Sequence, residues 1–265
     1  MCFAFDAHPP DLPADLVRHP RMAGGAGADK IELTSADGTT LSAALAESAK
    51  PSGGPAVIIL PDVRGLYRFY IELAERFAEA GHHAIAIDFF GRTAGTGERD
   101  ADWEYLPHVE QTRASQIQAD ADAARAALAE RTDATSFVTV GFCFGGAQSF
   151  LAATSPALLL DGAVGFYGLL AGGRFGMPRV LDHVGETRCP VLGLFGGDDQ
   201  AIPTSDVDTY DRLLSEADVE HEVVIYPGAP HSFFDRSYEE HVGACSDAWR
   251  RVISFLEQVG AARTA

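Results

Sequence analysis

Short apolar runs alternate with longer amphipathic stretches over most of the chain. The runs at residues 56–60, 83–87 and 191–195 are rich in aliphatic residues, as are strands that are buried on both faces of a sheet. Residues 70–80 are amphipathic with the period of a helix, and residues 110–130 are Ala-rich with charges on one face. We expect strands at 30–34, 40–46, 56–60, 83–87, 136–141, 162–167, 191–195 and 220–226, and helices at 70–80, 110–130, 144–154, 205–217 and 238–259. Strands separated by helices imply right-handed crossovers, so the pattern predicts an α/β fold with a mostly parallel sheet that helices flank on both faces.

The beginning of the chain does not follow this alternation. Pro9-Pro10, Pro13 and the Gly-rich stretch 24–27 predict an irregular N-terminal arm over residues 1–29. The turn Asp37-Gly38 between the first two expected strands indicates a hairpin at the edge of the sheet. Because no linker or internal repeat interrupts the alternation after this arm, we predict a single α/β domain over residues 30–265.

Composition narrows the class of protein further. The chain has 265 residues, 46% of them hydrophobic, and a formal net charge of −18. Such a charge would repel nucleic acid and anionic membranes, so we expect neither as a partner. No apolar run approaches the roughly 18 residues of a membrane helix, and the N-terminus does not have the pattern of a secretion signal. The four cysteines (Cys2, Cys143, Cys189 and Cys245) lack CxxC spacing, which disfavours a zinc site or disulfides and predicts a reducing cytoplasm.

One cysteine lies in a distinctive turn. The segment Gly141-Phe142-Cys143-Phe144-Gly145-Gly146 joins an expected strand to an expected helix. A nucleophile elbow needs small residues two positions before and after the reactive side chain, because the strained turn approaches neighbouring strands closely. At a helix N-terminus the sulfur of Cys143 meets a partial positive charge that favours the thiolate, and the N–H of Phe144 can face an oxyanion. Alternatively, Cys143 is a buried small apolar residue, as most free cysteines are.

Partners for such a nucleophile follow in the expected chain order. In an α/β-hydrolase the acid and then the histidine come from loops after later strands. Asp198 and Asp199 follow the strand at 191–195, and His231 follows the strand at 220–226. The histidine would take the thiol proton and an aspartate would fix its tautomer. These two adjacent aspartates compete for that role, and one of them could cap the next helix or face solvent.

The residues resemble the dienelactone hydrolases, a family of cysteine-dependent α/β-hydrolases. The resemblance runs from about residue 31 to residue 258 and rests on three motifs. These are Gly141-Phe142-Cys143-Phe144-Gly145-Gly146, Gly197-Asp198-Asp199-Gln200-Ala201-Ile202-Pro203 and Pro230-His231-Ser232-Phe233. In the family the catalytic aspartate precedes a proline in the pattern Asp-x-x-(Val/Ile)-Pro. This resemblance selects Asp199 over Asp198.

The resemblance also implies a thiol-activating acid and a second oxyanion donor. In the family an acidic residue after the strand that here ends in Ile59-Leu60-Pro61 contacts the resting thiol. The chain has Asp62 there, where the best-known members have the longer Glu, and Asp62 could instead be a turn residue. The N–H of Val63 corresponds to the second oxyanion donor beside that of Phe144.

Substrate binding in the family uses arginines that hold a carboxylate. Arg92 in Asp88-Phe89-Phe90-Gly91-Arg92 resembles one of them. Arg236 resembles the other, but it follows His231 by five residues where four are expected. Tyr167 resembles a pocket residue, and Arg64 is a further candidate. For each of these arginines the alternative is an ordinary solvated charge.

Together these features predict hydrolysis of a small ester or lactone, with or without a carboxylate of its own, by a monomer or small homo-oligomer. The specific form is the opening of a dienelactone to a dicarboxylate. One alternative is a general carboxylesterase or thioesterase for neutral acyl groups, and another is a non-catalytic ligand-binding protein on the same fold. No metal or organic cofactor is implied, because no phosphate-binding Gly-rich fingerprint follows a strand.

Overall fold

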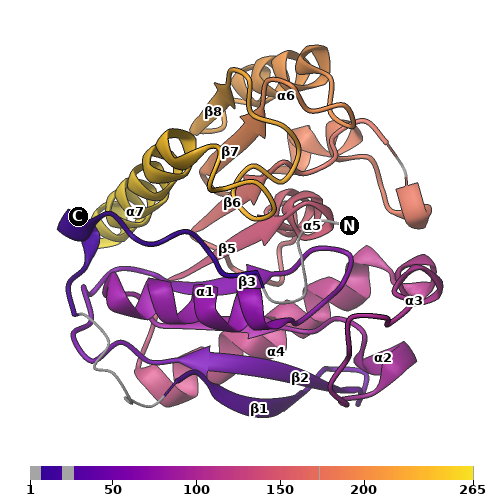
Figure 1. Cartoon of the computed structure of the whole chain (residues 1–265), viewed down its shortest axis with the longest axis vertical. Helices are drawn as coiled ribbons and strands as arrows, with labels where there is room; N and C mark the ends of the chain where they lie inside the picture. The colour runs from indigo at the N-terminus through magenta and orange to yellow at the C-terminus, as the bar shows by residue number, and fades with distance from the viewer. Residues whose placement is uncertain (1–6, 20–26, 173, 265) are drawn as a thin grey trace.

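A single twisted sheet forms the centre of the molecule (Figure 1). The structure is a computed structural model that describes residues 7–19, 27–172 and 174–264, and within these residues the sheet has eight strands. Their bounds are β1 (Asp29–Thr34), β2 (Thr40–Ala46), β3 (Ala56–Leu60), β4 (Ala84–Ile87), β5 (Phe137–Phe142), β6 (Gly162–Phe166), β7 (Val191–Gly196) and β8 (His221–Tyr226). The order is β1-β2-β4-β3-β5-β6-β7-β8; β2 is antiparallel to β1 and β4, and all other pairs are parallel. The predicted mostly parallel sheet with a hairpin at one edge is confirmed.

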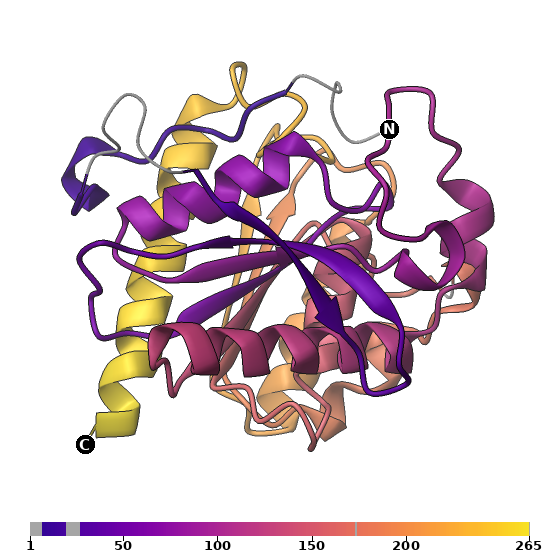
Figure 2. The same ribbon diagram turned by 90° about the horizontal axis from the view of Figure 1, so that it is seen from below.

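Helices cover both faces of this sheet. They are α1 (Arg68–Glu79), α2 (Gly91–Ala94), α3 (Leu106–Gln111), α4 (Ala114–Thr132), α5 (Phe144–Ala152), α6 (Thr204–Glu216) and α7 (Val242–Thr264), with short 3-10 turns η1 (Ala14–Leu16), η2 (Arg174–Gly176), η3 (Val180–Asp182) and η4 (Val184–Glu186). Figure 2 shows α1 and α4 on opposite sides of the strands. None of the described helices is long and apolar enough to cross a membrane.

The side chains of β3 alternate between the two faces of the sheet, so this one strand packs against the helices on both sides. Val57 and Ile59 lie in the same core cluster as the apolar residues of α1. Ile58 and Leu60 lie in the cluster that contains the apolar residues of α4. Successive side chains of a strand point to opposite faces. A strand between two helical layers must therefore be apolar at every position, as the uninterrupted apolar run predicts.

Two of the predicted helices differ from the structure by more than small shifts at their ends. The helix expected at 110–130 is two helices, α3 and α4, because Thr112 has an extended backbone with ψ 148° and its hydroxyl donates to the carbonyl of His108. The backbone N–H of Arg113 then donates to Oε1 of Gln116, which closes the start of α4. The last helix begins at Val242 and not at residue 238, because the chain after His231 first folds into successive turns.

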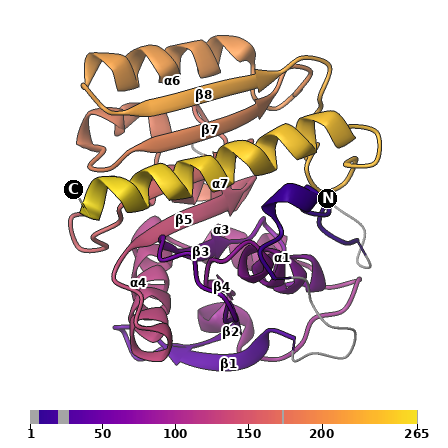
Figure 3. The same ribbon diagram turned by 90° about the vertical axis from the view of Figure 1, so that its left-hand side faces the viewer.

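The described part of the N-terminal arm packs against the outside of the helical layer. Residues 7–19 lie beside α1 and α7 (Figure 3). The indole N–H of Trp249 donates to the carbonyl of Pro10, and the N–H of Arg18 donates to the carbonyl of Glu79. Within this segment η1 is a single short turn. The remainder of the predicted arm at 1–6 and 20–26, including Cys2, lies outside the described residues.

Candidate active site

The turn between β5 and α5 places Cys143 at the carboxyl end of the sheet. Cys143 has φ 54° and ψ −112°, a strained conformation for a residue with a side chain. A Cβ on Gly141 would lie 1.9 Å from the carbonyl oxygen of Gly145, and a Cβ on Gly145 would lie 2.0 Å from that of Leu60. Only glycine fits at either position. The spacing of the glycines around Cys143 therefore follows from the close approach of this turn to its own helix and to β3.

Two loops bring a histidine and an aspartate to this sulfur. Nε2 of His231 lies 3.2 Å from Sγ of Cys143. Nδ1 of the same ring lies 2.7 Å from Oδ2 of Asp199, whose other oxygen accepts from the N–H groups of Ala201 and Ile202. The imidazole bridges an acid and a thiol, which is the arrangement that activates a nucleophile. The His231 side chain is 29% exposed, so it remains accessible to a substrate.

The adjacent aspartates have different surroundings. Asp199 is buried, and its carboxylate faces the histidine. Asp198 lines the cavity beside the site, while its N–H donates to the carbonyl of Ala229. The carboxylate that faces the histidine is thus that of Asp199, the aspartate that the resemblance to the family selects.

A cavity of about 420 Å³ opens above Cys143. Val63 and Phe144, the expected oxyanion donors, both line it. Much of the remaining wall is apolar and comes from the start of α3 and from the loop after β6; these residues include Tyr105, Leu106, Leu169, Phe175, Met177 and Pro178. A mostly apolar cavity with a few polar groups is typical of a small-molecule site.

Of the predicted substrate-binding residues, Tyr167 and Arg236 line this cavity. Tyr167 is fully buried at the end of β6, and its hydroxyl donates to Oδ2 of Asp235 over 2.9 Å. Its ring centroid lies 5.1 Å from that of His231. Arg236 follows directly after Asp235, so one short segment supplies the histidine, a buried acid and the arginine.

Asp62 and Arg64 lie in the segment after β3. Asp62 is fully buried; its N–H donates to the hydroxyl oxygen of Tyr70, and its Oδ1 accepts from the N–H of Arg64 over 2.8 Å. Its contact with the thiol stays a prediction. The guanidinium of Arg64 is buried over the Tyr67 ring, 4.4 Å from the centroid, and Arg64 does not line the described walls of the cavity.

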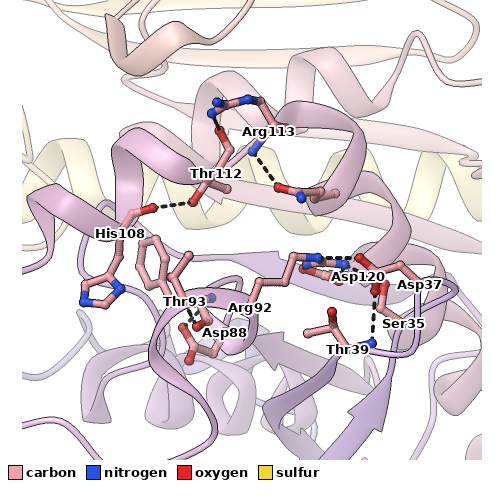
Figure 4. Close-up of polar contacts among 12 residues, drawn as sticks. Ser35, Asp37, Thr39, Asp88, Arg92, Thr93, His108, Thr112, Arg113 and Asp120 are labelled. Carbon is pink, nitrogen blue, oxygen red and sulfur yellow. Dashed lines mark hydrogen bonds and ion pairs between the residues drawn. The ribbon is translucent and has the colours of Figure 1, made fainter.

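The expectation that Arg92 binds substrate is not supported by its position. Figure 4 shows its guanidinium between Asp120 and Asp37. Nη1 and Nη2 bind the two oxygens of Asp120 at 2.7 and 2.9 Å, Nε binds Asp37 at 2.7 Å, and Nη2 also donates to Ser35. Arg92 is not among the described residues that line the cavity. It ties α2 and α4 to the turn between β1 and β2, and it holds the pKa of Asp37 well below its usual range.

Sequence reasoning missed Asp235 and the apolar cover of the cavity. Asp235 stands four residues after His231, at the position where the resemblance leads us to expect an arginine. The unexpected spacing of five residues between His231 and Arg236 was the sequence feature that could have pointed to Asp235. The cover, including Leu106 and Phe175, lies in segments outside the main alternation of strands and helices, so periodicity gives no signal for it.

The other described cysteines are buried in the core. Burial raises the pKa of both Cys189 and Cys245 to about 12. Both therefore stay protonated near neutral pH and behave as small apolar residues.

A cysteine in a tight strand-to-helix turn after β5, an aspartate after β7 and a histidine after β8, all at one end of a mostly parallel sheet, have the arrangement of an α/β-hydrolase. Residues 41–260 match the Dienelactone hydrolase family, and the chain belongs to this family.

Relatives and solved structures agree with this assignment. A protein of Escherichia coli K12 named "Putative carboxymethylenebutenolidase" is 31% identical over 220 residues, which cover 80% of each chain. A protein of the same name from Methylorubrum extorquens is 28% identical over 248 residues, 91% of this chain and 84% of the relative. A crystal structure titled "Putative Dienelactone Hydrolase" from Klebsiella pneumoniae superposes with a TM-score of 0.75 at 28% identity, over 88% of this chain and all of that one. The chain is thus a hydrolase that is similar to carboxymethylenebutenolidases.

Proposed function

We propose that this hydrolase cleaves a small carboxylic ester or lactone through a thioester on Cys143. The observation that carries the proposal is the continuous line from Asp199 through His231 to the sulfur, at 2.7 and 3.2 Å. In the first half of the reaction Nε2 accepts the thiol proton, and the sulfur attacks the carbonyl carbon. The carbonyl electron pair moves to the oxygen, where we assign the N–H groups of Val63 and Phe144 as donors. Collapse of this intermediate expels the alkoxide or enolate, which takes the proton from His231 and leaves an acyl-thioester.

Water completes the cycle in the second half. His231 removes a proton from a water molecule, whose oxygen attacks the thioester carbonyl. The resulting intermediate expels the thiolate, which is reprotonated through His231, and the carboxylic acid product departs. Asp199 keeps the proton of the resting imidazole on Nδ1 throughout, so that Nε2 is free to act as a base.

Two substrate classes fit this machinery. The first is a dienelactone-type enol lactone, in which the carboxylate of the substrate would meet Arg236 in the cavity. The second is an ester or thioester of a neutral acyl group. A specific observation favours this second class: Arg92, the other expected carboxylate ligand, is held by Asp120 and Asp37 away from the cavity, whose walls are mostly apolar.

The test is steady-state hydrolysis of a dienelactone and of a neutral p-nitrophenyl ester by the wild type and Cys143→Ala. We expect the variant to lose on the order of 10⁴-fold or more of kcat/KM on whichever substrate the wild type accepts. Cys189→Ala is the matched control, because it removes a buried thiol outside the site. A clear preference of the wild type for either substrate decides between the two classes.

Retention of most turnover by Cys143→Ala would refute the mechanism. If the wild type cleaved neither substrate but bound one of them, a non-catalytic ligand-binding role would replace it.

A further inference from the structure

Asp235 is a buried carboxyl group that the proposed reaction does not use. It lies in the turns that follow His231, and only 1% of it is exposed. Carboxyl groups are seldom buried so completely, because burial penalises the charged form. The surrounding structure must therefore compensate for its presence.

Its two oxygens bind two walls of the cavity. Oδ2 accepts from the hydroxyl of Tyr167 over 2.9 Å, and Oδ1 accepts from the backbone N–H of Arg236. Tyr167 and Arg236 both line the cavity above Cys143. The N–H of Asp235 also donates to the carbonyl of Ser232, directly after His231. One carboxyl group thus joins the end of β6 to the segment that carries the histidine.

Some of the strained backbone positions of the molecule lie at the same contacts. Tyr167 has φ 38° and Ser232 has φ 63°, and Cys143 occupies the strained turn after β5. Non-glycine residues hold such conformations only where their surroundings fix them, and the cost is about 1–3 kcal/mol each. The ring of Tyr167 packs beside the ring of His231 at 5.1 Å between centroids. The hydrogen bond to Asp235 is thus one of the contacts that hold Tyr167 in place.

We propose that Asp235 is a positioning residue for the hydrolysis, which holds the Tyr167 phenol against His231 and thereby keeps the imidazole in line between Asp199 and Cys143. This role rests on the proposed hydrolytic function, since it serves the histidine of that mechanism. Asp235 itself does not touch the reacting atoms.

The protonation state of Asp235 should make the rate of hydrolysis depend on pH. Burial, and next the negative charge of Asp62, raise the pKa of Asp235 from 3.8 to about 8. The hydroxyl of Tyr167, the N–H of Arg236 and the charge of His231 oppose this rise. Near pH 7 the group is therefore mostly neutral. Ionisation at higher pH adds a further negative charge near His231, which disfavours the negative charge that develops on the oxyanion.

Protein stability should respond to the same proton. The unfolded chain loses the proton of Asp235 near pH 4, whereas the folded chain keeps it to about pH 8. Between these values the folded state binds more protons, so the contribution of Asp235 is fully present below pH 4 and is lost as pH rises through 8. Asparagine cannot titrate, so Asp235→Asn should lack this dependence.

The experiment compares the pH profiles of kcat and of Tm for the wild type, Asp235→Ala, Asp235→Asn and Tyr167→Phe on the substrate that the wild type accepts. We expect Asp235→Ala to lower kcat on the order of 10²-fold, the cost of a histidine displaced by about 1 Å, with a smaller change in KM. Asp235→Asn keeps an acceptor and should restore most of that loss. The wild type should lose kcat above pH 8, and Asp235→Asn should not. The wild-type Tm should fall relative to that of Asp235→Asn by on the order of 5 °C between pH 5 and pH 8.

Tyr226→Phe is the matched control for Tyr167→Phe. The hydroxyl of Tyr226 also donates to an aspartate, Asp247, over 2.9 Å, but Tyr226 does not line the described walls of the cavity. Tyr167→Phe should lower kcat on the order of tenfold, whereas Tyr226→Phe should not.

The proposal is overturned if Tyr167→Phe behaves like Tyr226→Phe, or if the pH profiles of Asp235→Asn and the wild type superpose. Tyr167→Phe and Asp235→Asn both nearly preserve side-chain volume, so these outcomes are decisive even where Asp235→Ala fails to fold. Failure of the proposed hydrolytic function can be told apart from failure of this proposal, because in the first case Cys143→Ala would remain active.

Discussion

Two clusters in this molecule pair acidic side chains with basic ones. One of them opens on a cavity, and the other is closed within the protein. The Cys-His-Asp corner comprises Cys143, His231 and Asp199, and it opens on a cavity of about 420 Å³. The arginine clasp comprises Arg92, Asp120 and Asp37, and it joins α2 and α4 to the hairpin of β1 and β2. In the corner, the backbone is strained and the histidine remains accessible. In the clasp, all three guanidinium nitrogens bind side chains of the protein.

The contrast shows why residue type alone does not identify a binding site. Arginine recognises a carboxylate by a bidentate pair of hydrogen bonds, whether that carboxylate belongs to a substrate or to the protein. Asp120 is fully buried and accepts such a pair from Arg92. A substrate would have to displace this internal partner and leave a buried charge uncompensated. Arg236, by contrast, lines the cavity, where a substrate can meet it.

The largest expected effect tests the acid proposed for the Cys-His-Asp corner. Asp199→Asn should lower kcat on the order of 10⁴-fold, because asparagine can donate to Nδ1 and stabilise the wrong tautomer of His231. Asp198→Asn is the matched control, since the carboxylate that faces the histidine belongs to Asp199. Steady-state kinetics of both variants on one substrate separate the two. A larger loss in Asp198→Asn would reverse the assignment of the acid.

Thiol reactivity distinguishes the corner from the buried core. Because the pKa of Cys189 and Cys245 is about 12, almost none of either is thiolate at about pH 7.5, and thiolate is the reactive form. Iodoacetamide should therefore modify Cys143 on the order of 10³-fold faster, as followed by peptide mass spectrometry in a Cys2→Ser background. Equal rates at Cys143 and a core cysteine would show that the corner does not expose a reactive thiol.

Removal of the clasp should affect stability and not substrate binding. Arg92→Ala leaves Asp120 buried without its partner, which costs about 3 kcal/mol in the free energy of unfolding. Urea denaturation measures this loss, and the KM for a neutral ester should stay within about twofold of the wild type. A raised KM for an anionic lactone with unchanged stability would instead return Arg92 to the substrate site.

The smallest effect concerns the arginine in the cavity. Arg236→Ala should lower kcat/KM about tenfold for a substrate that carries a carboxylate, the effect of one lost charge-assisted hydrogen bond. A neutral p-nitrophenyl ester of similar size is the matched control and should be nearly unaffected. If both substrates lost equally, Arg236 would shape the wall of the cavity without recognising charge.

Some parts of the fold and the site could be predicted because their causes are local. The apolar run of β3 and the glycines around Cys143 are each explained by neighbouring residues or by one tight turn. The break at Thr112 was missed, because the Ala-rich pattern continues across it and a side-chain hydrogen bond to His108 decides it. Asp235 was missed because sequence does not reveal that its carboxyl group is buried against Tyr167, 68 residues away.

The sequence by itself determined the alternation of strands and helices, the elbow around Cys143 and the chain order of cysteine, aspartate and histidine. These features depend on backbone sterics and on the burial of apolar faces, which adjacent residues express directly. Only the tertiary structure decided that Arg92 is held by Asp120 and Asp37, 28 and 55 residues away. It also decided that Arg236 and apolar walls surround the sulfur. The pairing of a charged side chain depends on which distant segment reaches it first, and burial makes that choice costly to reverse.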